Sequence, residues 1–329
     1  MNTGDITGVL YANRVREYSP VYAHDVVYAH RDSGDLTLQI LTPEENNYHP
    51  ASQHSPSVFD EIREKALKEG REVPFRPMPA NRHRFPLIVD VPGSGWSGNQ
   101  GYEHMAAMMK LSRAGYVTAS VKYRGTFRDD VRFPAAVQDV KEAVRFLRAH
   151  ADEFLVDVDR VALLGDSSGG HTVAMAALTG DEPRFSIGEN SDQTAAVKSC
   201  VIYYGPNDLN NLVADRIAEG KTLRPGEGKY PFEAREIFKD DYLADPEGMF
   251  ADASPVNYIS AEKKMPPFLF LNGDDDPIIP LAQGIRFCNK VKACGGKAEF
   301  YKIVGGGHGV GCWTEETEEL ILRFFKATL

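Results

Sequence analysis

Cysteine is scarce in this sequence. Four cysteines occur in 329 residues and no two form a C-x-x-C pair; they are Cys200, Cys288, Cys294 and Cys312. This number and spacing exclude a disulfide-stapled scaffold and a Cys-x-x-Cys zinc or redox motif. Unpaired, scattered thiols are typical of proteins in a reducing compartment, so the composition predicts a cytoplasmic location.

Long apolar runs and positive charge are also lacking. Nowhere do about 18 apolar residues follow one another, which excludes a membrane-spanning helix. Residues 1–12 lack the basic and apolar segments of a signal peptide. The 37 Lys and Arg residues are outnumbered by 47 Asp and Glu residues, giving a net charge of −10. Nucleic acids and anionic membranes attract basic surfaces, so we expect neither as a partner.

The chain does contain enough apolar material for a large core. Apolar residues make up 42% of the sequence and aromatic residues 10%, which excludes wholesale disorder. Domains usually run to about 100–200 residues, so the length alone allows one large domain or two ordinary ones.

From about residue 86 onward, short apolar runs alternate with helical patterns. Such alternation is typical of an α/β fold with a mostly parallel central sheet and helices on both faces. The expected strands are residues 87–91, 117–123, 161–164, 200–204, 268–271 and 298–303, and the expected helices are residues 134–150, 281–293 and 315–327. Before them, residues 25–28 and 36–41 are typical of an antiparallel hairpin at one edge of the sheet.

Two polar stretches interrupt this alternation. Residues 44–85 hold one helical pattern at 58–68, and residues 206–252 hold two, at 210–218 and 232–238. Long insertions in α/β proteins usually form lids, binding loops or oligomer arms. We therefore predict a single domain over residues 1–329, with a polar insertion at 44–85 and a cap at 206–252.

The clearest chemical motif is Gly-Asp-Ser-Ser-Gly-Gly at residues 165–170. It follows a predicted strand and precedes a helical segment, as the G-x-S-x-G nucleophile elbow requires. The serine of an elbow sits on a sharp turn, where the residues two positions before and after it need very small side chains. Ser167 is therefore the candidate nucleophile, and the dipole of the following helix favours negative charge near it.

A serine nucleophile needs a base, and the base needs a carboxylate to orient it. Two histidines follow Ser167 in the sequence, and His171 lies within the elbow helix, where it is expected to pack. His308 stands in a glycine-rich loop after a strand and before the last helix, where a base can reach the elbow. The acid is expected among three adjacent aspartates at residues 274–276, between which chemistry alone does not choose.

Acyl transfer also needs backbone N–H groups that stabilise an oxyanion. The loop Pro-Gly-Ser-Gly-Trp at residues 92–96 is the candidate, with one N–H from Gly93 or Ser94 and the other from Ser168. Trp96, in the same loop, is expected to line the substrate pocket or to pack in the core.

A competing motif overlaps this loop. Residues 93–98 match G-x-G-x-x-G, the dinucleotide fingerprint, but the next strand ends without the carboxylate that the fingerprint expects. A nicotinamide-dependent oxidoreductase therefore stays an alternative whose support is limited to Lys122 and Arg124. No metal-ligand spacing is present either, so neither a cofactor nor a metal is predicted.

These motifs together resemble those of the α/β-hydrolase superfamily, in its esterase/lipase branch with acetyl-esterase-like, feruloyl-esterase-like and kynurenine-formamidase-like proteins. The resemblance covers roughly residues 22–43, 86–205 and 252–329. It implies an α/β-hydrolase fold with a cap insertion, and its acid motif, aligned with residues 272–280, selects Asp276. The chain departs from the branch at Pro92 and Asn272, where the branch has histidines, and at Ser94, where it has glycine.

The resemblance implies a serine carboxylesterase with the triad Ser167, Asp276 and His308. Its expected substrate is a small-molecule acyl ester, for example an acetylated or aromatic-acyl carbohydrate. An arylformamidase or small peptidase would use the same triad, and the altered oxyanion loop keeps a non-catalytic binding protein as another alternative. The sequence does not decide whether the chain forms a homo-oligomer.

Overall fold

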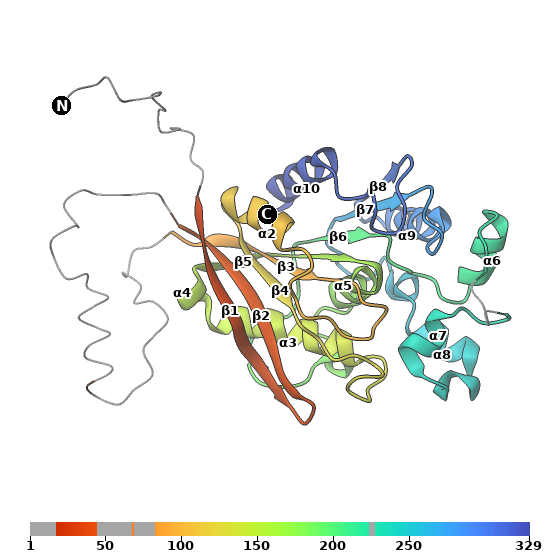
Figure 1. Cartoon of the computed structure of the whole chain (residues 1–329), viewed down its shortest axis with the longest axis horizontal. Coiled ribbons are helices and arrows are strands. Elements are labelled where there is room, and N and C mark those ends of the chain that lie inside the picture. The colour runs from red at the N-terminus through yellow and green to blue at the C-terminus, as the bar shows by residue number, and fades with distance from the viewer. Residues whose placement is uncertain (1–17, 45–67, 69–82, 224–227) are drawn as a thin grey trace, which may run out of the picture.

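One eight-stranded sheet organises the protein (Figure 1). It is seen in a computed structural model, and the structure describes residues 18–44, 68, 83–223 and 228–329. The strand order is β1-β2-β4-β3-β5-β6-β7-β8. The strands span Ser19–Arg31 (β1), Gly34–Glu44 (β2), Phe85–Val91 (β3), Val117–Val121 (β4), Val156–Asp166 (β5), Ser199–Tyr203 (β6), Phe268–Gly273 (β7) and Ala298–Ile303 (β8).

The sheet is parallel from β4 to β8 and antiparallel at one edge. Strands β3 to β8 all pair in parallel, whereas β1 pairs with β2, and β2 with β4, in the antiparallel sense. The predicted parallel sheet with an edge hairpin is therefore confirmed. The largest boundary differences are in β1, which begins at Ser19 rather than at residue 25, and in β5, which begins at Val156 rather than at residue 161.

Helices cover both faces of the sheet. The longer α-helices span Met105–Arg113 (α2), Ala135–Ala149 (α3), Ser167–Thr179 (α5), Leu281–Ala293 (α9) and Glu315–Thr328 (α10), and the short ones are Ala151–Phe154 (α4) and the 3-10 turns Pro183–Phe185 (η3) and Pro255–Tyr258 (η5). The predicted helix at 281–293 matches α9, and the other two predicted helices differ from α3 and α10 by one residue at an end or at both.

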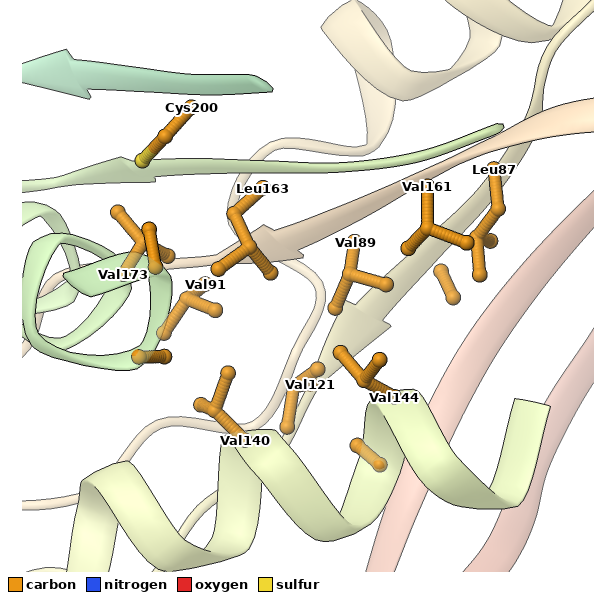
Figure 2. Close-up of a cluster of buried hydrophobic side chains, with 14 of the residues drawn as sticks. Leu87, Val89, Val91, Val121, Val140, Val144, Val161, Leu163, Val173 and Cys200 are labelled. Carbon is orange, nitrogen blue, oxygen red and sulfur yellow. The ribbon is translucent and has the colours of Figure 1, made fainter. Parts of the chain in front are cut away.

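Alternate side chains of each strand enter opposite halves of the core. Val89 of β3 packs with Val140 of α3 and Val173 of α5 (Figure 2). Its neighbour Ile88 instead packs with Met108 of α2 on the other face. A strand buried on both faces explains why β3, β4 and β6 are fully buried along their length.

The region predicted as a cap forms a group of short helices. They span Leu212–Ala218 (α6), Glu233–Phe238 (α7), Asp241–Leu243 (η4) and Pro246–Asp252 (α8). In Figure 1 they lie together at one end of the molecule, away from the β1–β2 hairpin. The predicted insertion at 44–85, with its helical pattern at 58–68, falls almost entirely outside the described residues.

Candidate active site

Ser167 lies at the sharp turn between β5 and α5. Its backbone has φ +50°, in the left-handed region that non-glycine residues rarely adopt. A Cβ on Gly169 would lie 1.8 Å from the carbonyl oxygen of Val91, and one on Gly165 would lie 2.7 Å from that of Gly169. The two motif glycines are therefore required by close backbone contacts, and the strained turn presents Ser167 to the pocket.

Three predicted side chains form one line of hydrogen bonds. Ser167 Oγ lies 2.8 Å from His308 Nε2, and His308 Nδ1 lies 2.8 Å from Asp276 Oδ2. With Nδ1 protonated, the ring donates to Asp276 and accepts the hydroxyl proton of Ser167. This is the nucleophile, base and acid geometry of serine hydrolases.

The acid is held in one orientation by its own loop. Asp276 is fully buried, and its Oδ1 accepts hydrogen bonds from the backbone N–H groups of Ile278 at 2.7 Å and Ile279 at 2.9 Å. Asp274 instead binds the backbone N–H of Gly305 at 2.7 Å and lies near Lys302, at the start of the base loop. The three adjacent aspartates are thus distinguished by their partners, and Asp276 is the one that contacts His308.

His171 packs inside the protein, as predicted. Its Nδ1 accepts the indole N–H of Trp96 at 3.3 Å, and its Nε2–H donates to the carbonyl oxygen of Ala253 at 2.7 Å. Burial lowers the pKa of His171 to about 4, so the ring stays neutral near pH 7. Trp96 is buried with it and also contributes to the pocket wall.

The oxyanion loop is bound to the nucleophile elbow by its own amides. The backbone N–H of Gly93 donates to Asp166 Oδ1, and that of Ser94 donates to Ser168 Oγ at 2.8 Å. The hydroxyl of Ser94 lies 2.8 Å from that of Tyr123, which donates to the carbonyl oxygen of Pro92. Both loop amides proposed from the sequence therefore have protein acceptors in this structure.

A largely buried charge cluster that includes Asp166 of the elbow was not identified from the sequence. His104 Nδ1 lies 3.0 Å from Asp90 Oδ1, and its Nε2 lies 3.4 Å from Asp166 Oδ1. The hydroxyl of Ser120 donates to Asp90, and that of Tyr204 donates to Asp166. The one visible signal was a charged residue, Asp90, within an otherwise apolar strand.

The site opens into a pocket of about 520 Å³. Its wall includes the elbow, the oxyanion loop, the base loop and Ile278 and Ile279 of the acid loop. The region predicted as a cap supplies Phe232, Glu233 and Glu236, in and directly before α7. A small organic substrate fits a pocket of this size, and the cap forms part of its surface.

Comparisons with known proteins agree with this geometry. The BD-FAE family model matches residues 76–291. The chain is 32% identical to the esterase LipQ of Mycobacterium tuberculosis over 237 residues, which cover 71% of this chain and 52% of LipQ. The chain thus spans about half the length of this curated relative.

Solved structures show the same fold. A truncated carbohydrate esterase from gut microbiota superposes with a TM-score of 0.71 at 22% identity, covering 95% of this chain and 98% of that one. Propionate-bound esterase 2 of Thermogutta terrifontis superposes with a TM-score of 0.65 at 20% identity, covering 97% of each chain. These likenesses place the sheet and its helices in the α/β-hydrolase fold. No helix within the described ranges is both long and apolar enough to cross a membrane.

Proposed function

The chain belongs to the BD-FAE family, and from this premise we propose that it is a serine carboxylesterase acting on small acyl esters. The observation that carries the proposal is the unbroken line of hydrogen bonds from Ser167 through His308 to Asp276, at the mouth of a pocket. Family membership alone names a fold and a chemistry, whereas this geometry supplies the groups that perform it.

In the first half of the proposed reaction, Ser167 Oγ attacks the ester carbonyl carbon. The hydroxyl proton passes to His308 Nε2, and the resulting imidazolium is stabilised by buried Asp276. The imidazolium then protonates the leaving alcohol, which yields an acyl-enzyme on Ser167. In the second half, His308 accepts a proton from water, which attacks the acyl-enzyme and releases the acid and Ser167.

We propose that the two oxyanion donors come from residues 92–96 and from the start of α5. The N–H of Gly93 binds Asp166, which leaves Ser94 as the better donor from residues 92–96. Its N–H has to exchange Ser168 Oγ for the substrate oxygen. The N–H of Ser168, in the first turn of α5, supplies the second donor, where the helix dipole also favours negative charge.

For the substrate, we propose esters of carbohydrates or related polyols with a small acyl group. Support comes from the structural neighbour described as a carbohydrate esterase and from the mixed wall of the pocket, in which Trp96 and Phe232 lie beside Glu233 and Glu236. Aromatic faces next to hydrogen-bond acceptors suit a ring that carries hydroxyl groups.

The experiment is ester hydrolysis by the wild type and by Ser167→Ala. The wild type is expected to release p-nitrophenol from p-nitrophenyl acetate, and Ser167→Ala is expected to lower kcat by roughly 10⁴-fold. Circular dichroism of both proteins checks that they are folded. Turnover by Ser167→Ala at the wild-type rate would contradict the proposed nucleophile. A folded wild type without turnover on any ester or amide would instead favour a binding protein.

A further inference from the structure

One residue on the wall of the reaction pocket carries an unsatisfied oxygen. Glu233, the first residue of α7, is 4% exposed and lines the pocket that holds Ser167 and His308. Its Oε2 is buried and has no hydrogen-bond partner among the described residues. Buried carboxylate oxygens are almost always paired in folded proteins, so an unpaired one on a pocket wall points to a missing ligand.

The other carboxylate oxygen of Glu233 is firmly held. Arg216 Nη2 donates to Glu233 Oε1 at 2.6 Å, and both side chains are almost fully buried. Arg216 Nε also donates to the carbonyl oxygen of Ile278 at 2.7 Å, and the N–H of Ile278 donates to the catalytic acid, Asp276. The pair therefore fixes the start of α7 to the acid loop and leaves Oε2 in one position.

The charge balance of this pair selects the kind of group that it can bind. Arg216 forms an ion pair with Glu233, which offsets the charge of the carboxylate, so Oε2 can accept a hydrogen bond from a neutral donor. A neutral hydroxyl supplies one donor and does not need a counter-charge. The adjacent apolar residues Phe232 and Ile278 suit the carbon skeleton that carries such a hydroxyl.

We propose that Glu233 is a specificity-determining residue, whose Oε2 accepts a hydrogen bond from a hydroxyl group of the substrate while Arg216 holds the carboxylate in place. The inference rests on the proposed esterase function and assigns the recognition of a hydroxyl to one cap residue. A substrate without the hydroxyl leaves Oε2 unpaired in the closed complex, and a site built to bind a hydroxyl discriminates against such a substrate.

The test uses Glu233→Gln and two matched pairs of esters. Glutamine keeps an oxygen for Arg216 and places an NH₂ donor where Oε2 lies, so it reverses the hydrogen bond with little change in shape. Glycerol monoacetate and propyl acetate differ in hydroxyls on the alcohol, and ethyl glycolate and ethyl acetate differ in a hydroxyl on the acyl group. The measured quantity is the ratio of kcat/KM for the hydroxylated ester to that for the plain ester.

In Glu233→Gln, this ratio is expected to fall by roughly 10- to 100-fold in at least one pair. Arg235→Gln, an exposed change on the same helix, is expected to keep both ratios at the wild-type values. Equal effects of Glu233→Gln on both members of each pair would overturn the inference, because they would indicate a purely structural role. If the wild type hydrolyses none of the four esters, it is the proposed function that fails.

Discussion

Two histidine–carboxylate pairs contact neighbouring residues of the turn between β5 and α5, and they differ in the group that the second ring nitrogen contacts. In one pair, His308 Nδ1 lies 2.8 Å from Asp276, and Nε2 faces Ser167. In the other, His104 Nδ1 lies 3.0 Å from Asp90, and Nε2 faces a second carboxylate, Asp166. Each ring also packs on an aromatic side chain, His308 on Tyr204 and His104 on Trp313.

The second carboxylate changes the protonation of the ring. Burial of His104 opposes its positive charge, but Asp90 and then Asp166 outweigh it and raise the pKa of His104 to about 9. Near pH 7 this ring is an imidazolium and cannot accept a proton. A general base has to alternate between its neutral and its protonated form. Under the proposed mechanism, a histidine with an aspartate partner acts as a base when its other nitrogen contacts a hydroxyl. A second carboxylate at that nitrogen instead makes the histidine a structural cation.

The two pairs also meet at one residue. Asp166 Oδ1 contacts both His104 Nε2 and the N–H of Gly93, and Asp166 directly precedes Ser167. Asp90 is the next-to-last residue of β3, the strand that leads into the proposed oxyanion loop, and Ser120 of the neighbouring strand donates to it. The buried cluster thus fixes the oxyanion loop against the elbow, which explains the charge within the apolar strand β3.

The largest expected effect separates the two histidines by rate. His308→Ala is expected to lower kcat for p-nitrophenyl acetate by roughly 10⁴-fold, because Ser167 loses its base. His104→Gln is expected to lower kcat by about 10-fold or less, since it touches neither substrate nor nucleophile. Steady-state kinetics of the two purified variants measures both values. Equal losses in the two variants would remove the distinction between base and structural cation.

A smaller effect is expected on the free energy of unfolding when the charge cluster around His104 is disrupted. His104→Gln leaves Asp90 and Asp166 buried without their cation, and we expect it to lower the free energy of unfolding by about 3–5 kcal/mol. The matched control is His30→Gln, which disrupts an exposed pair with Asp35 and is expected to cost under about 1 kcal/mol. Urea unfolding followed by circular dichroism gives both values. A loss at His104 no larger than that at His30 would show that the cluster contributes little.

The smallest effect is a dependence of stability on pH. Because the folded pKa of His104 is about 9 and its usual value is 6.5, its contribution is complete below pH 6.5 and is lost as pH rises through 9. Linkage predicts that wild-type stability falls by about 2 kcal/mol more than that of His104→Gln between pH 6.5 and pH 8.5. Unfolding curves at the two pH values test this difference, and parallel behaviour of the two proteins would contradict it.

The sequence predicted the parts of the site that lie in local motifs. The elbow at Ser167 was recognisable because close backbone contacts demand glycine at fixed positions, and the loop at His308 because positive φ angles favour glycine at Gly305 and Gly309. Asp276 was chosen from three aspartates by family resemblance, and the structure shows the physical difference, namely which of them is buried against His308.

The remaining features depend on the tertiary structure. His104 directly precedes α2, which packs on β4, and the pairing of β4 with β3 brings His104 to Asp90. Glu233 is held at the pocket because Arg216 joins it to the acid loop. Neither the pair His104–Asp90 nor the pair Glu233–Arg216 has a sequence spacing that is characteristic of a known motif. The hydrogen bond from the N–H of Gly93 to Asp166 could not be predicted either, because the motif indicates the type of loop and not its hydrogen bonds.

The most direct test of the central claim is the rate at which a fluorophosphonate labels the protein. Intact-mass spectrometry and peptide mapping are expected to find one adduct on Ser167 in the wild type. Labelling is expected to be absent in Ser167→Ala, slowed by at least about 10³-fold in His308→Ala and slowed by about 10-fold or less in His104→Gln. An unlabelled wild type, or equal slowing in the two histidine variants, would contradict the assignment of Ser167 as nucleophile and His308 as its base.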